Sequence, residues 1–91
     1  MPERRVVIGS KVGLHARPAA LFVQAATAAP VPVTIAKDGG DPVNARSILS
    51  VLALDARGGD QVVIAAEGDG ADAALDALVT VLETDHDAAE G

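Results

Sequence analysis

Residues 13–20 read GLHARPAA, and they predict a loop that turns into a helix, with a histidine at the turn. Gly13 can adopt backbone angles that other residues avoid, so the chain can bend sharply there. Pro18 fits only the first turn of a helix, because it lacks an N–H and its φ is fixed. The helix must therefore begin close to His15. The first N–H groups of a helix carry the positive end of its dipole, so His15 lies beside an anion site to which Arg17 adds a permanent charge.

A histidine nucleophile at an anion site indicates phosphoryl transfer. Neutral imidazole carries a lone pair at physiological pH and can attack a phosphoryl group. The backbone N–H groups of Ala16 and Arg17 would hold the phosphate, and the Arg17 guanidinium would balance its charge. A lone histidine in a small domain is more often a surface residue or a satisfied polar group. The place of His15 between Gly13 and Pro18 favours the functional interpretation.

A second motif, NARSIL, follows at residues 44–49. The two motifs resemble those of HPr, the histidine-containing phosphocarrier family of the phosphoenolpyruvate-dependent sugar phosphotransferase system, and the resemblance covers about residues 4–83. It implies that His15 accepts a phosphoryl group on Nδ1 from enzyme I, which draws on phosphoenolpyruvate. It also implies that Arg17 stabilises this phosphate and that the group passes to sugar-specific enzyme IIA domains during sugar uptake. Such a protein is a carrier on which other enzymes act, and not itself an enzyme.

Ser47 has two interpretations. Its hydroxyl can cap a short helix, because it can accept a hydrogen bond from an N–H two or three residues further on. The sequence around it also resembles the regulatory phosphorylation site of many Gram-positive HPr proteins, which implies a serine kinase and a transcription regulator as partners. A phosphate there would meet the N–H groups of the helix start and would add about two negative charges to a docking surface.

Four apolar side chains are the predicted docking residues for partners. In the family, apolar residues around the short helix and beside the histidine form this surface, and the corresponding residues here are Leu21, Ile48, Leu49 and Leu52. Leu21 falls off the apolar stripe of its own helix, which predicts that it faces solvent. A patch of this kind ringed by Arg17 and Arg46 would suit a transient interface, since a carrier must leave one partner to reach the next.

Three other functions remain alternatives. A regulatory binding module would act through phosphorylated Ser47, but relatives that do only this lack the histidine. A nitrogen-regulatory phosphotransferase paralogue would share the chemistry of His15 and differ in its partners. A stand-alone hydrolase or transferase would use His15 as a base, but the sequence offers neither a second catalytic group nor a substrate pocket.

The composition narrows the class of protein. The 91 residues make one domain, with a core built from Val, Ile, Leu and Ala because Phe22 is the only aromatic residue. The absence of cysteine excludes disulfides and thiolate metal sites. A formal charge of −6 without aromatic platforms argues against nucleic-acid binding. No apolar run approaches the roughly 20 residues of a membrane helix, so we expect a cytoplasmic protein without membrane insertion, and a monomer.

The chain divides into an HPr-like domain at residues 1–84 and an acidic C-terminal tail at residues 85–91. The second histidine, His86, lies in this tail. A metal site would need more ligands held rigidly, and a tail supplies neither. We therefore expect no metal and no cofactor.

Hydrophobic periodicity predicts seven elements. The strands are expected at 5–8, 31–37, 42–43 and 61–67, and the helices at 16–28, at 47–54 and from the 68–70 turn to about residue 83. Alternation predicts that Val62, Ile64 and Ala66 face one way, and Pro42 limits 42–43 to a short or edge strand. A turn is expected at residues 58–60. Asp69 is the predicted cap of the last helix. The pattern alone indicates an α+β sandwich with helices on one face of a sheet. The resemblance implies an open-faced β-sandwich, in which three helices cover one face of a four-stranded antiparallel sheet in the order βαββαβα.

Overall fold

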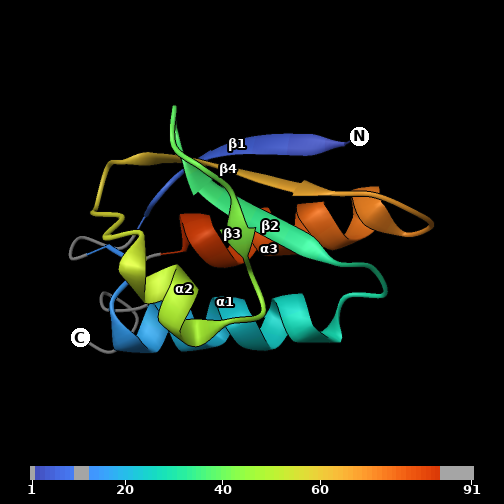
Figure 1. Cartoon of the computed structure of the whole chain (residues 1–91), viewed down its shortest axis with the longest axis horizontal. Coiled ribbons are helices and arrows are strands. Elements are labelled where there is room, and N and C mark those ends of the chain that lie inside the picture. Colours follow the sequence, from blue (N-terminus) through green and yellow to red (C-terminus); the bar gives the residue numbers. More distant parts are fainter. Residues whose placement is uncertain (1, 10–12, 85–91) are drawn as a thin grey trace.

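The computed structural model describes residues 2–9 and 13–84, and within them it confirms the predicted order of elements (Figure 1). In chain order these are β1 (Glu3–Val7), α1 (Ala16–Ala28), β2 (Val33–Lys37), β3 (Val43–Asn44), α2 (Ile48–Ala53), β4 (Gln61–Ala66) and α3 (Ala71–Glu83). The three helices of this part of the chain lie on the same side of the sheet, and α1 packs against both α2 and α3. The fold is the open-faced sandwich that the resemblance implied.

The sheet has the strand order β1-β4-β2-β3, and each neighbouring pair is antiparallel. Strand β4 is central, with Val62 opposite Val6 of β1 and Ile64 opposite Ile35 of β2. Strand β3 is a two-residue edge strand, as predicted, since Pro42 just before it cannot donate to a ladder. The arrangement leaves β1 and β3 at the two edges and one sheet face uncovered by helices (Figure 1).

The core lies between the sheet and the helices and is almost entirely aliphatic. Phe22 of α1 is fully buried, as are Leu75 of α3 and Val51 of α2. Every second residue of β4 is buried, which matches the alternation predicted for that strand. On the opposite sheet face Val7 is 54% exposed. The sequence prediction of a core without aromatic pairs is confirmed.

The start of α3 differs from the prediction. Gly70 and not Asp69 is the N-cap residue, with φ at +87°, in the left-handed region that glycine favours. A Cβ atom at this position would approach Pro30 Cγ to 2.9 Å. The close approach of two loops therefore places a glycine at the cap, and Asp72 is the acidic residue of the first turn. Smaller differences lie at the ends of the strands and of α2. Residues 85–91, including His86, lie outside the described residues.

Candidate functional site

His15 is the N-cap residue of α1. Its backbone is extended, with φ −91° and ψ −168°, and its carbonyl oxygen accepts a hydrogen bond from the Ala19 N–H at 2.9 Å. Its imidazole makes no capping hydrogen bond to the described first turn, and the residue is exposed. Helix caps are usually Ser, Thr, Asp or Asn, whose oxygens satisfy the first N–H groups. A histidine here therefore places its ring beside the helix start without taking over that role.

The chain reaches His15 through a tight contact at Gly13. This glycine has φ +81°, and a Cβ atom on it would lie 2.2 Å from the Ala56 carbonyl oxygen and 2.5 Å from Arg57 Cα. The next residue, Leu14, is buried and donates its N–H to the same Ala56 oxygen at 2.8 Å. The predicted bend at Gly13 is confirmed. Its second cause, contact with the segment after α2, was not predicted from the sequence.

The residues in the first turn of α1 favour the binding of an anion. Pro18 is buried in this turn, where its missing N–H costs no helical hydrogen bond. The turn contains no acidic residue among residues 16–19, and Arg17 is exposed on it. A helix N-terminus favours negative charge, and here the turn itself supplies none. An imidazole, the helix start and a guanidinium thus share one small part of the surface.

The short helix α2 presents an apolar patch, which we define as Ile48, Leu49 and Leu52. These side chains are 36%, 77% and 38% exposed. The fourth predicted docking residue, Leu21, is only partly exposed, because α1 is flanked by both α2 and α3. Ser47 is the N-cap of α2, and its hydroxyl oxygen accepts a hydrogen bond from the Ser50 N–H at 3.3 Å. The capping interpretation of Ser47 is confirmed.

The guanidinium of Arg46, which the sequence placed at the rim of the apolar patch, is bound at the C-terminal end of α1. Its guanidinium donates to three carbonyl oxygens at the C-terminal end of α1 and just beyond it: Ala26 at 3.1 Å, Ala29 at 2.8 Å and Val31 at 3.3 Å. Its backbone N–H donates to the Asn44 side chain at 2.9 Å. A cation at a helix C-terminus is stabilising, because the last carbonyls have no partner in the helix. The role of Arg46 is therefore structural, at the end of α1 opposite to His15.

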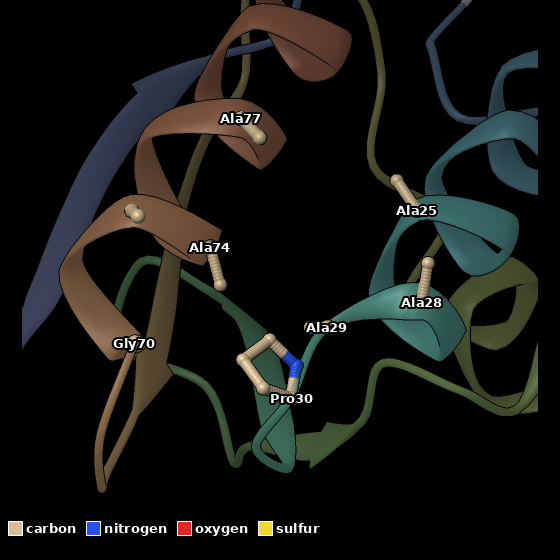
Figure 2. Close-up of a pocket in the computed structure, with 8 residues that line it drawn as sticks. Ala25, Ala28, Ala29, Pro30, Gly70, Ala74 and Ala77 are labelled. Atoms are coloured by element: carbon tan, nitrogen blue, oxygen red, sulfur yellow. The ribbon is translucent and has the colours of Figure 1, made fainter.

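A cavity of about 440 Å³ lies between the C-terminal half of α1 and the start of α3. Figure 2 shows Ala25 and Ala28 on one side of it and Ala74 and Ala77 on the other, with Pro30 near Gly70. Its described lining consists of alanine, proline and glycine. Such walls supply no acid, base or nucleophile. The cavity also lies at the opposite end of α1 from His15, so it adds nothing to the chemistry of that site.

Residues 2–9 and 13–84, which the structure describes, contain neither a membrane-spanning helix nor a cluster of metal-ligating side chains. None of their helices is long and apolar enough to cross a membrane. No group of three or more His, Asp or Glu side chains among them could hold a metal ion.

Comparison with known proteins identifies the family. Residues 2–84 match the family model described as the PTS HPr component phosphorylation site. The chain belongs to the HPr family. The HPr phosphocarrier protein of Streptomyces coelicolor is 57% identical over 82 residues, which cover 90% of this chain and 88% of that protein. The HPr-like protein Crh of Halalkalibacterium halodurans is 40% identical over 83 residues, which cover 91% and 98% of the two chains.

The HPr fold is also evident from solved structures. The crystal structure of HPr-C-His from Thermoanaerobacter tengcongensis superposes with a TM-score of 0.84 at 43% identity, over 91% of this chain and 92% of that one. HPr proteins are phosphocarriers of the phosphotransferase system and not catalysts. The sequence missed two features of this HPr chain, the contact of residues 56 and 57 with Gly13 and the helix-capping role of Arg46. Both join segments far apart in the chain, and neither has a local signal.

Proposed function

We propose that this HPr chain accepts a phosphoryl group on His15 from enzyme I, with phosphoenolpyruvate as the source, and passes it to sugar-specific enzyme IIA domains. The observation that carries the proposal is the exposed His15 at the start of α1, where its ring does not cap the described first turn. His15 favours the carrier over a module that acts only through Ser47. The family match ends at residue 84, which supports residues 1–84 as the carrier domain and 85–91 as a tail.

The proposed transfer needs little beyond positioning and charge stabilisation. A neutral imidazole nitrogen, Nδ1 by resemblance, attacks the phosphorus, the N–P bond forms, and the donor leaves with the electron pair of its broken bond. The negative oxygens then lie against the helix start, where the N–H groups of Ala16 and Arg17 can donate to them. The Arg17 guanidinium adds charge-assisted hydrogen bonds. The reverse attack by an acceptor nucleophile restores neutral His15.

The apolar patch of α2 is the proposed docking surface, with Leu21 beside it. The exposure of Leu49, at 77%, beside the partly exposed Ile48 and Leu52 supports this role, because a group of exposed apolar side chains is typical of an interaction site. The patch is small, as suits a complex that must form and dissociate in each transfer. A Leu49→Ser variant is expected to raise the KM for phosphorylated enzyme I while its stability and kcat stay close to those of the native protein.

The carrier proposal is tested by intact mass spectrometry after incubation with phosphoenolpyruvate and a bacterial enzyme I. We expect a gain of one phosphoryl group that brief acid treatment removes, since phosphohistidine is acid-labile. The gain should be absent in His15→Ala. A chain truncated after Thr84 should still accept the group. No gain with a competent enzyme I would reject the carrier function in the sugar system and leave two alternatives: regulation through Ser47, or a nitrogen-regulatory carrier with its own enzyme I.

Regulation by phosphorylation of Ser47 is the second candidate function. Ser47 is partly exposed at the start of α2, and its neighbour Ile48 belongs to the apolar patch. A phosphate at this cap would be compatible with the helix and would add about two negative charges next to the docking surface. Treatment with an active HPr serine kinase should add an acid-stable phosphate to the native chain and none to Ser47→Ala. A native chain that stays unmodified would contradict this second function.

A further inference from the structure

One five-residue segment holds both ends of the loop that leads to His15. We call residues 56–60 the brace. At the start of the loop, the Ile8 N–H donates to the Asp60 carbonyl at 2.9 Å, and the Gly59 N–H donates to the Ile8 carbonyl at 3.1 Å. At its end, the Ala56 carbonyl accepts the Leu14 N–H at 2.8 Å. The loop is thus anchored at both ends by the same short piece of chain, which joins α2 to β4.

The shape of the brace depends on Asp60. Residues 57–60 form a turn in which the Asp60 N–H donates to the Arg57 carbonyl at 2.9 Å, with Gly59 at φ +87° in the third position. The Asp60 carboxylate closes the turn a second time, because its Oδ2 accepts the Arg57 N–H at 3.0 Å. The same oxygen lies 3.7 Å from Lys37 Nζ. Truncating the Asp60 side chain removes both of these Oδ2 contacts and leaves the backbone hydrogen-bonding groups of the brace in place.

We propose that Asp60 is a positioning residue for His15. The inference rests on the proposed function, since it concerns the orientation of the phosphoryl acceptor. Asp60 makes no described contact with His15 and acts through the backbone. Its Oδ2 fixes Arg57, and Arg57 and Ala56 lie against Gly13, whose missing Cβ allows that approach. If the turn relaxes, Ala56 and Arg57 move away from Gly13. The start of α1 is then displaced relative to the buried Leu14 that precedes His15.

The test compares three variants with the native chain in the enzyme I reaction. Asp60→Ala removes the acceptor for the Arg57 N–H. Asp60→Asn keeps a side-chain oxygen in the same place while removing the charge. Asp41→Ala, in the exposed connection between β2 and β3, removes one carboxylate elsewhere and serves as the matched control.

We expect Asp60→Ala to lower kcat by about ten- to hundredfold, because small displacements of a reacting group are costly. Its KM for enzyme I should stay unchanged, since the apolar patch is untouched. Asp60→Asn should recover kcat to within about twofold of the native value, and Asp41→Ala should match the native chain. Native kcat in Asp60→Ala would overturn the inference. An equal loss in Asp60→Ala and Asp60→Asn would assign the effect to charge and would also overturn it.

A second readout does not depend on the proposed function. In Asp60→Ala, amide hydrogen exchange should quicken at Ile8 and Leu14, whose N–H groups bond to the brace, while the central strand residue Ile64 keeps its protection. Unchanged exchange at Leu14 would reject the positioning role even if the native chain were never phosphorylated. Failure of the native chain to accept phosphate, with quickened exchange in the variant, would instead reject the proposed function alone.

Discussion

At and just beyond the C-terminal end of α1, the guanidinium of Arg46 donates to three carbonyl oxygens, whereas at its N-terminal end α1 begins on an exposed histidine that does not cap the described first turn. Both ends of a helix attract charge of a fixed sign, positive at the C-terminus and negative at the N-terminus. The chain satisfies the first demand with its own side chain. For the second, the first turn contributes no acidic residue. The N-terminal end of α1 is therefore suited to an anion that binds and is later released.

The other two helices support this interpretation. Helix α2 begins on Ser47, whose hydroxyl caps it, and α3 carries Asp72 in its first turn. The helix start at His15 therefore differs from both of the other described helix starts in offering neither a capping oxygen nor a carboxylate of its own. Charge substitutions at these helix ends should therefore have effects that decrease from the N-terminus of α1, through its C-terminus, to the N-terminus of α3.

Filling the N-terminal end of α1 with a permanent carboxylate should have the largest effect. His15→Asp removes the nucleophile and supplies a good cap, so phosphorylation by enzyme I should be lost while the fold becomes more stable than that of His15→Ala by about 1 kcal/mol. Mass spectrometry and urea unfolding measure the two properties. Equal stability of the two variants would show that a negative charge does not stabilise this helix start. The proposed difference between the two ends of α1 would then be wrong.

Removing the cation beside His15 should slow transfer without unfolding the protein. Arg17→Ala is expected to lower the rate of phosphorylation by about ten- to hundredfold, the equivalent of the roughly 1.5–3 kcal/mol contributed by a hydrogen bond to a charged group. Arg17→Lys keeps the charge but not the forked geometry, so its rate should be intermediate. Stopped reactions analysed by mass provide the rates. Native kinetics in Arg17→Ala would remove Arg17 from the site.

Removing the cation from the opposite end of α1 should lower the stability of the protein without slowing transfer. Arg46→Ala removes the guanidinium donor from three carbonyl oxygens and is expected to lower the free energy of unfolding by about 1–3 kcal/mol. Phosphorylation of the folded fraction should proceed at the native rate, because His15 lies at the other end of the helix. Urea unfolding and the rate assay separate these effects. A slower reaction at unchanged stability would return Arg46 to the docking surface, where the sequence first placed it.

The sequence predicted the features that depend on neighbouring residues. The combination of Gly13 and Pro18 located the start of α1, Ser47 was identified as a cap, and alternation in β4 assigned its buried face. These follow from backbone angles and periodicity, which a short window of sequence contains. The family resemblance supplied the four-stranded antiparallel sheet, and it made specific the roles that the local residues indicate for His15 and Arg17.

What the sequence did not predict depends on segments that meet only in the folded chain. Arg46 reaches carbonyls some 15–20 positions away, and Gly13 contacts Ala56 although all of α1, β2, β3 and α2 lie between them in the chain. The cap of α3 is Gly70 and not the predicted Asp69, because Pro30 lies too close for a side chain at that position. Such contacts have no period and no fixed spacing, and a residue type that suits them also suits an exposed surface. Arg46 was therefore assigned to a rim, and the brace was read as a simple turn.

The smallest effect is expected at α3, whose N-terminal end already has its own carboxylate. Asp72→Asn removes the charge from the first turn and weakens the 3.2 Å ion pair with Arg4, both at the surface. The expected loss of stability is about 0.5–1 kcal/mol, since exposed pairs and dipole interactions each contribute little and are screened by salt. Urea unfolding at low and high ionic strength measures this loss, which should shrink as salt is added. Phosphorylation should be unaffected, because the carboxylate at the start of α3 comes from its own Asp72 and α3 takes no part in the His15 site. A change in the rate at His15 equal to that of Arg17→Ala would mean that the overall charge of the chain, rather than the charge at each helix end, governs the reaction.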